Sequence, residues 1–292
     1  MNLENLVGVL ISGLSGAAIL FLVGAGLTLV FGALRLINMA HGSLYMIGAF
    51  LAVSLIGALA GPLGFAIAVL AASVGVGIIG GLIEVLILRR LYGRDLLFQL
   101  VATFALILII DGLVRVVFGT DFHRVVAPAA LTGSVALAGA SRPVYQIFLV
   151  AVAVAVAGAL SGILFWTGLG RNIRAAVADP ELLGLAGVNV PALFTAVFVI
   201  GAILAGLAGA VVAPYHAVSL GIDVDIVVEA FAVTIIGGLG SLYGALLGAL
   251  IVGLVESFGV YAAPKFSLAL IFVVMAVVLA VRPWGLFGQP DR

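Results

Sequence analysis

The sequence predicts an all-α membrane protein, a polytopic bundle of transmembrane helices. Of its 292 residues, 65% are hydrophobic and only 8% are charged, whereas about a quarter of the residues in soluble domains are charged. The mean hydropathy is +1.44. The apolar stretches are continuous, whereas the strands of a membrane barrel alternate apolar and polar residues. These three observations exclude a soluble globular domain and a disordered chain.

Charge balance and residue usage exclude several classes of function. Twelve basic residues balance twelve acidic ones, so no basic field attracts nucleic acid or an anionic surface. The chain has no cysteine, which excludes disulfides and zinc–thiolate sites. Its only lysine is Lys265, and neither a phosphate-binding GxxxxGK[ST] loop nor an HExxH zinc pattern is present. A membrane process that needs energy would therefore draw it from a partner ATPase or an ion gradient, and a passive process would need none.

The apolar residues divide into blocks of the length that a membrane span requires. A spanning helix needs roughly 20 apolar residues. Eight such blocks lie at 13–33, 43–60, 63–88, 96–118, 145–166, 191–213, 226–258 and 266–282. We expect the first ten residues to form a short interfacial helix, with no cleavable signal, and residues 1–292 to form a single transmembrane domain.

Two polar, glycine-containing stretches interrupt these blocks. The stretch 35–43 lies between the first two blocks, and the stretch 237–241 lies near the middle of the seventh. The seventh block is too long for one simple helix, so we expect two half-length helices that meet at a glycine break. Transporters receive polar cargo at the N-termini of such half-helices. The alternative is a short surface loop between two spans.

Small residues recur at helical spacing along several blocks. Residues four apart lie on one helix face, where glycine lets two backbones approach closely. The pattern occurs at Gly77/Gly81, Gly158/Gly162, Gly244/Gly248 and along Gly201, Ala205 and Gly209. These positions are predicted helix–helix contacts.

Basic residues predict the orientation of the chain in the membrane. Arginines follow the third and fifth blocks and the last one, at Arg89, Arg90, Arg94, Arg171, Arg174 and Arg282. The positive-inside rule places these segments in the cytoplasm. The segments 119–144 and 214–225 then lie outside, the N-terminus is external, and the number of crossings is odd.

The cytoplasmic segment 170–191 carries the signals of a short amphipathic helix. Asp179 suits the N-cap, with Pro180 at the first helical position and Glu181 in the first turn. Apolar residues follow at 182, 183, 185 and 186, and Gly187 suits the helix end. Such a helix outside the membrane is predicted to dock on another protein. The alternative is a connecting loop packed on its own bundle.

Four motifs, in order along the chain, resemble the LivH-type permease subunits of branched-chain amino acid ABC importers. They are the region 26–32 with 38–43 and 48–50, the segment 170–191, the stretch 236–241 followed by Gly244 and Ala245, and the terminal run 282–288. In this resemblance the segment at about 168–190 is the coupling loop, which docks into the ATPase subunits. Its coupling surface is implied at Arg171, Asn172, Arg174, Asp179, Glu181, Gly184 and Gly187.

The resemblance also implies partners and a location. The partners are a homologous LivM-type permease, two cytoplasmic ATPases that hold ATP and Mg, and a periplasmic substrate-binding protein, all at the bacterial inner membrane. This chain itself is expected to be no enzyme and to hold no cofactor or metal. We further hypothesise that the two interrupted stretches border the substrate path, at Asn38, His41, Ser43, Gly237, Gly238, Gly240 and Ser241.

Ionisable residues inside the spans are functional candidates. Asp111 and Arg115 lie four apart and are predicted to pair on one helix face, either as a gate of the path or as a structural pair. Glu84, Glu229 and Glu256 are interpreted as boundary residues near span ends. With no inward-facing carboxylate network expected, a proton-coupled mechanism is disfavoured.

The preferred function is therefore a permease subunit of an ATP-driven importer for branched-chain or other hydrophobic amino acids. The same class includes importers of urea, amides or aromatic acids. A different class, a stand-alone ion-coupled carrier or channel, is the main rival, and a membrane scaffold without transport is a weaker one.

Overall fold

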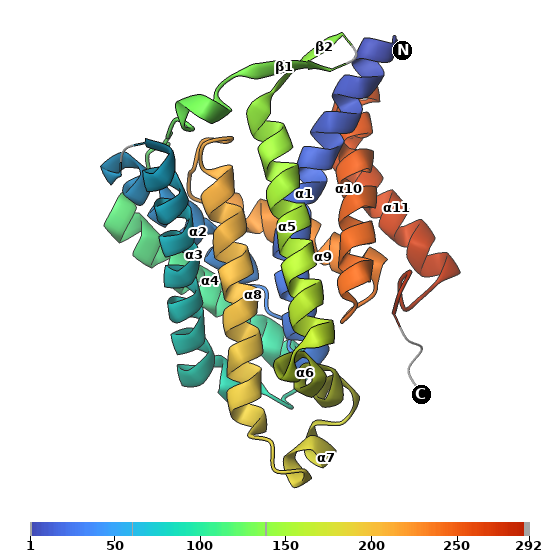
Figure 1. The fold of residues 1–292 in the computed structure, drawn as a ribbon. Helices are drawn as coiled ribbons and strands as arrows, with labels where there is room; N and C mark the ends of the chain where they lie inside the picture. Colours follow the sequence, from blue (N-terminus) through green and yellow to red (C-terminus); the bar gives the residue numbers. More distant parts are fainter. Residues whose placement is uncertain (1, 60, 138, 289–292) are drawn as a thin grey trace.

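The computed structural model describes residues 2–59, 61–137 and 139–288, which form a bundle of long helices (Figure 1). The predicted all-α fold is confirmed. The helices are α1 (Leu3–Leu34), α2 (His41–Ala58), α3 (Gly61–Leu86), α4 (Leu96–Phe118), α5 (Val144–Trp166), α6 (Gly168–Ala178), α7 (Pro180–Leu185), α8 (Val190–Val212), α9 (Ile222–Gly237), α10 (Leu242–Ala262) and α11 (Ser267–Val281). Short 3-10 turns lie at Leu88–Leu91, Ala129–Leu131 and Pro264–Phe266.

Eight of the described helices are long and apolar enough to cross a membrane. They are α1 to α5, α8, α10 and α11, the last extended by the turn before it, and they match the predicted blocks. At 16 residues, α9 is shorter than a full span. The chain is thus a multi-pass membrane protein.

The two ends of the bundle differ in what they carry. Figure 1 shows the N-terminus beside the hairpin of β1 (Ser134–Leu137) and β2 (Ala140–Pro143), whereas α6 and α7 lie at the opposite end. The strands are antiparallel and pair Ser134 with Pro143 and Val135 with Arg142. This arrangement agrees with a cytoplasmic α6–α7 segment and an external hairpin.

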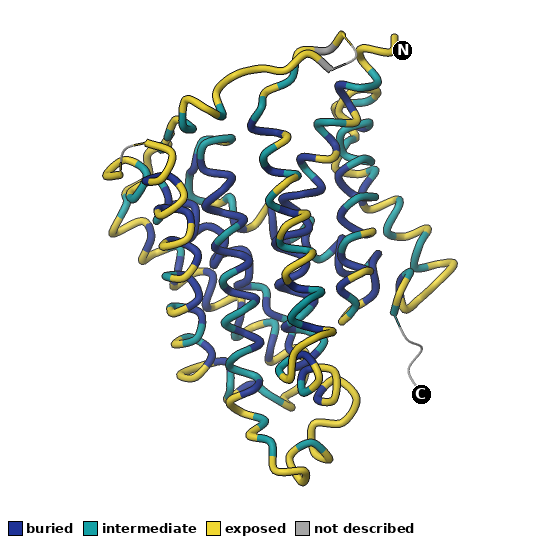
Figure 2. The backbone as a smooth tube through the Cα atoms, in the orientation of Figure 1, coloured by how far each residue is buried: buried dark blue, intermediate teal, exposed yellow. Residues whose placement is uncertain are grey.

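Helix α1 is the centre of the bundle and contacts α5, α8, α9 and α10. Most of its middle and C-terminal part is buried, whereas α4, α5 and α11 expose much of their surface (Figure 2). Glycines permit the closest crossings. A side chain at Gly48 of α2 would collide with the backbone of Gly206 on α8, and one at Gly253 of α10 with the backbone of α1.

Three expectations about helix extent are wrong. The first ten residues are no separate helix, because α1 runs without a break for 32 residues, about 48 Å. The seventh block divides into one short helix, α9, and one full-length helix, α10, rather than into two halves. Residues 222–225 also belong to α9 rather than to an external loop, and Asp223 is buried.

The predicted glycine contacts are found in three helices of the four. Gly77 and Gly81 of α3 pack on α8, Gly201 and Gly209 pack on α1 and α2, and Gly244 and Gly248 pack on α9. The pair Gly158/Gly162 in α5 meets no other helix, since a side chain at Gly158 would touch nothing and one at Gly162 only Trp166 of α5 itself.

Candidate functional site

The first interrupted stretch turns the chain back into the bundle. Helix α1 ends at Leu34, and Arg35 adopts a left-handed backbone conformation, with φ of 49°, that reverses the chain direction. The N–H of Ile37 then donates a 3.2 Å hydrogen bond to Oε1 of Gln99 on α4. The returning segment is thus held on a neighbouring helix before α2 begins at His41.

Helix α2 begins deep inside the bundle. The His41 ring and the Gly201 carbonyl both lie where a side chain at Gly26 of α1 would point. Gly201 is the midpoint of α8, which runs from residue 190 to 212. The break between α1 and α2 is therefore an internal one, and the first turn of α2, capped by no side chain, faces the interior.

This interior segment holds polar groups without partners. Asn38 and His41 are 1% and 0% exposed, yet neither the amide of Asn38 nor either ring nitrogen of His41 has a hydrogen-bond partner in the described structure. The hydroxyl of Thr28 on α1 is in the same state. Buried polar groups are nearly always satisfied, so these three are free to bind a water molecule or another polar partner.

A second interior helix start meets the first. Ser43 Oγ donates a 2.9 Å hydrogen bond to Oδ2 of Asp223 in the first turn of α9. A side chain at Gly42 would collide with the Asp223 carbonyl oxygen. The N-terminal ends of α2 and α9, both carrying the positive end of a helix dipole, therefore converge on one buried carboxylate.

The second interrupted stretch lies elsewhere, at the α6–α7 end of α1. Gly240 packs on Gly32, six residues or about 9 Å along α1 from Gly26. Gly238 is covered by the C-terminal segment, in which Leu286 and Phe287 donate backbone hydrogen bonds to Ile236 and Gly237. Ser241 caps α10 by accepting from the N–H of Gly244. The structure thus separates the seven predicted path residues into an interior group at 38–43 and a turn at 237–241.

The predicted coupling segment consists of two helices, of which only α7 is expected from the sequence. Asp179 caps α7 by accepting from the N–H groups of Glu181 and Leu182, and Gly187, with φ of 85°, follows its end. The helix α6 before it is capped by Thr167, which accepts from the N–H of Gly170. The sequence signal for α6 is this Thr-x-x-Gly start followed by buried residues at 173 and 176.

Helix α7 lies at the end of the bundle with two of its three leucines uncovered, whereas Leu183 packs against the core. Leu182 and Leu185 are 63% and 86% exposed, and no residue of α7 is buried. All seven predicted coupling residues lie on this segment, and all but the half-buried Asn172 are exposed. Arg174 also stacks on Phe165 at the end of α5, 5.3 Å from the ring centre. The surface formed by the exposed residues of α6 and α7 therefore packs on the bundle on its inner side and is exposed on its outer side.

Two ion pairs are present in the described chain. Arg115 donates to Asp111 at 3.3 Å on the exposed side of α4, as their spacing predicts. Arg89 binds the carboxylate of Glu84, which is fully buried, and also Thr195 of α8. The hydroxyl of Tyr92 donates a 2.7 Å hydrogen bond to Glu84. Burial is the main cause that raises the pKa of Tyr92, and this hydrogen bond is the second, so the hydroxyl keeps its proton. Glu84 lies near the end of α3, as predicted, but it is a buried tertiary anchor rather than a residue in contact with interfacial water.

Comparison with known families decides what kind of protein carries these features. The family model described as "Branched-chain amino acid transport system / permease component" matches residues 9–279. The chain belongs to this permease family. The family predicted from the four motifs is thereby confirmed.

Relatives match nearly the whole permease. It is 30% identical to the high-affinity branched-chain amino acid transport system permease protein BraD of Pseudomonas aeruginosa, over 97% of this chain and 95% of that one. It is 28% identical to the corresponding permease protein LivH of Escherichia coli K12, over 92% of this chain and 91% of that one. A shorter match, over 40% of the permease, is 32% identical to the fructose import permease protein FrcC of Rhizobium meliloti. No solved structure gives a significant match.

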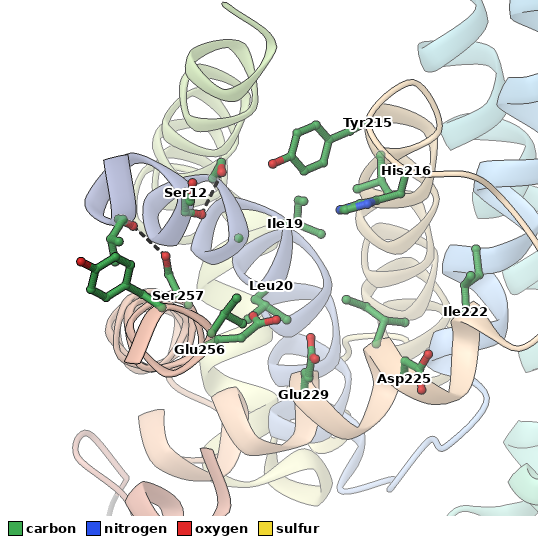
Figure 3. Close-up of a pocket in the computed structure, with 18 of the residues that line it drawn as sticks. Ser12, Ile19, Leu20, Tyr215, His216, Ile222, Asp225, Glu229, Glu256 and Ser257 are labelled. Atoms are coloured by element: carbon green, nitrogen blue, oxygen red, sulfur yellow. Dashed lines mark hydrogen bonds between the residues drawn. The ribbon is translucent and has the colours of Figure 1, made fainter. Parts of the chain in front are cut away.

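The permease also has an outer cavity that the sequence did not reveal. A space of about 610 Å³ opens between α1, α9 and α10 at the hairpin end. Figure 3 shows Asp225, Glu229, Glu256 and His216 around it. Arg142 also lines the cavity. Glu229 and Glu256, which are far apart in the sequence, are half-buried and share this cavity with the exposed Asp225. The sequence pattern that could have indicated this cavity is the spacing of residues 222, 225, 226 and 229, which places them on one face of α9.

Proposed function

We propose that the permease is the membrane subunit of an ATP-driven importer that moves branched-chain or other hydrophobic amino acids across the bacterial inner membrane. The observation that carries the proposal is the exposed α7 on a chain of this permease family. A helix with two uncovered leucines at the cytoplasmic end fits a cleft on another protein. The sequence contains no phosphate-binding loop, so a partner ATPase supplies the energy.

The proposed partners each correspond to one face of the molecule. One of the two ATPase subunits takes the α6–α7 surface, where Leu182 and Leu185 provide apolar anchors and Arg171, Asp179 and Glu181 provide charge. A periplasmic binding protein delivers cargo at the hairpin end, beside the outer cavity. A homologous LivM-type permease covers part of the exposed apolar surface, to which the uncovered Gly158/Gly162 face of α5 is suited.

The interior supports passage of a small solute with one polar end. The first turns of α2 and α9 offer backbone N–H groups and the unpartnered side chains of Asn38 and His41 to a polar head group. Apolar helix faces surround them and suit an aliphatic tail. Tight capture belongs to the binding protein, because a permease must also release its cargo.

The proposal is tested by reconstituting the permease with its second permease, ATPases and binding protein in proteoliposomes. We expect labelled leucine to accumulate only when ATP and all subunits are present. ATP turnover with accumulation of urea, a short amide or an aromatic acid, but not of leucine, contradicts the substrate class and keeps the importer. Accumulation by this chain alone on an ion gradient contradicts the importer and supports the stand-alone carrier.

A further inference from the structure

The carboxylates of the outer cavity have no cationic partner in the described chain. The two ion pairs of the described chain involve other carboxylates, those of Glu84 and Asp111. Figure 3 shows Glu229 on α9 and Glu256 on α10 lining the same space beside α1, with Asp225 one turn away from Glu229. Glu256 Oε2 lies 4.0 Å from the position that a Cβ at Gly16 would take. Carboxylates withdrawn from bulk water in a membrane protein are stabilised by a cationic group.

Further polar groups face the same cavity. Tyr45 of α2 is 5% exposed and lines its inner side, and none of the hydrogen bonds found among the described residues involves its hydroxyl. Beside these groups lie apolar side chains of α1 and α9, including Ile19, Leu20 and Ile226. Converging polar groups against an apolar wall are the usual make-up of a small-molecule site.

A basic residue stands at the mouth of the cavity. Arg142 reaches from β2 across α1, where its guanidinium occupies the space that a side chain at Gly8 would need. Its Nε is buried and has no partner. Gly8 and Gly16 are eight residues apart on α1, about 12 Å, so the guanidinium and the Glu256 carboxylate are too far apart for one amino acid head group to touch both. The cavity therefore has a positively charged mouth at Arg142. Its floor, formed by Asp225, Glu229 and Glu256, is negatively charged.

The chemistry of the floor selects among ligands. Among the residues that the structure describes, no group of His, Asp and Glu is gathered closely enough to hold a metal ion. An organic ammonium group suits the more widely spaced carboxylates and the tyrosine hydroxyl, because it donates three hydrogen bonds in separate directions. A free carboxylate is repelled by the floor, and an uncharged amide gains no ionic contact.

We propose that the outer cavity binds the α-ammonium group of an amino acid at Glu229 and Glu256. It would be the first binding position that the amino acid reaches after the binding protein releases it. Asp225 adds to the negative field, and Arg142 orients the zwitterion with its carboxylate toward the mouth. Tyr45 of α2 adds a buried hydroxyl to the lining of the same cavity. The inference rests on the proposed function and specifies how that function selects zwitterions.

Charge-neutralising variants test the floor in the reconstituted importer at saturating loaded binding protein. Glu229→Gln and Glu256→Gln are each expected to reduce leucine uptake about tenfold, as expected for loss of one charge-assisted hydrogen bond. Asp121→Asn, which neutralises an exposed carboxylate of the external segment, is the matched control and keeps wild-type uptake. Assembly is checked by co-purification of the ATPases. Wild-type uptake in both cavity variants overturns the inference, whereas absence of uptake in the wild type contradicts the proposed function instead.

A labelling experiment tests occupancy without transport. The chain has no native cysteine, so Ser12→Cys places a single thiol in the cavity and Val126→Cys places one in the exposed external segment. Leucine and isoamylamine, which both carry an ammonium group, are expected to slow the reaction of an impermeant thiol reagent at position 12 only. Isocaproate, which has the carbon skeleton of leucine without the ammonium, is expected to give no protection. Equal protection by isocaproate, or none by leucine at millimolar concentration, overturns the inference.

Discussion

Ser43 on α2 donates a 2.9 Å hydrogen bond to Asp223 on α9, and both side chains are buried. The two residues are 180 positions apart in the sequence. Their contact joins the first turns of the two helices that begin inside the bundle. Along the chain, Asp223 is two residues from Asp225, which lines the outer cavity, and Ser43 is two residues from His41, whose ring nitrogens have no hydrogen-bond partner.

Removing this bond is expected to weaken the bundle and impair transport together. Ser43→Ala removes one hydrogen bond from a buried carboxylate and is predicted to lower the free energy of unfolding by about 1 kcal/mol. Ser54→Ala in the same helix is the control, because Ser54 bonds only to the carbonyl of Phe50 one turn earlier. Thermal unfolding and uptake of the two variants are compared. Equal unfolding temperatures for the two variants would contradict a structural role for the Ser43–Asp223 bond.

Replacing Asn38 is expected to separate stability from transport. Its amide is buried without partners, so Asn38→Leu removes unsatisfied groups and is predicted to leave the unfolding temperature unchanged or higher. Uptake is nevertheless expected to fall, because the polar interior loses a contact for the passing head group. A variant that is destabilised but transports normally for its amount in the membrane would show that Asn38 is structural only.

The close crossing of α2 and α8 requires a glycine. Gly48→Ala forces its Cβ into the backbone of Gly206 and is predicted to cost roughly 1–3 kcal/mol. Gly57→Ala, in the last turn of the same helix, meets no atom within 4 Å and is predicted to be neutral or stabilising by about 0.5–1 kcal/mol. Chemical denaturation of the purified variants measures both. The opposite order of stabilities would mean that α2 and α8 do not cross at Gly48.

The Glu84 cluster is expected to anchor α3 to α8 at the C-terminal end of α3. Arg89→Ala removes the cationic partner of the fully buried Glu84 carboxylate and is predicted to destabilise the protein strongly. Arg90→Ala, which removes the exposed neighbouring arginine, is predicted to have little effect. The double variant Glu84→Gln/Arg89→Ala is expected to recover part of the loss, which a thermal unfolding series measures. Similar losses in the Arg89 and Arg90 variants would argue against the anchor.

Much of the fold follows from local patterns in the sequence. Continuous apolar runs predict the long helices because a span must satisfy its own backbone. Asp179, Pro180 and Gly187 predict the ends of α7 because capping depends on a few neighbouring residues. The glycine break near residue 238 is likewise local, since its positive φ suits glycine alone.

What the sequence does not reveal depends on contacts between distant segments. Glu229 and Glu256 look like separate boundary residues along the chain. They line one cavity only because α9 is short and α10 turns back along α1. The depth of His41 follows from Gly26 and Gly201, which come from two other helices. The sequence predicts polar residues near a break, and only the packing distinguishes the interior group from the turn at 237–241.

We expect partner ATPases to move this permease through the exposed helix α7. The most direct test is ATP-dependent leucine uptake into proteoliposomes by the wild-type complex and by the Leu182→Glu/Leu185→Glu variant. Because both side chains are exposed, the variant is predicted to fold with an unchanged unfolding temperature, while ATPase attachment and leucine uptake are lost. Wild-type uptake by the variant, with the ATPases still attached, would contradict the claim.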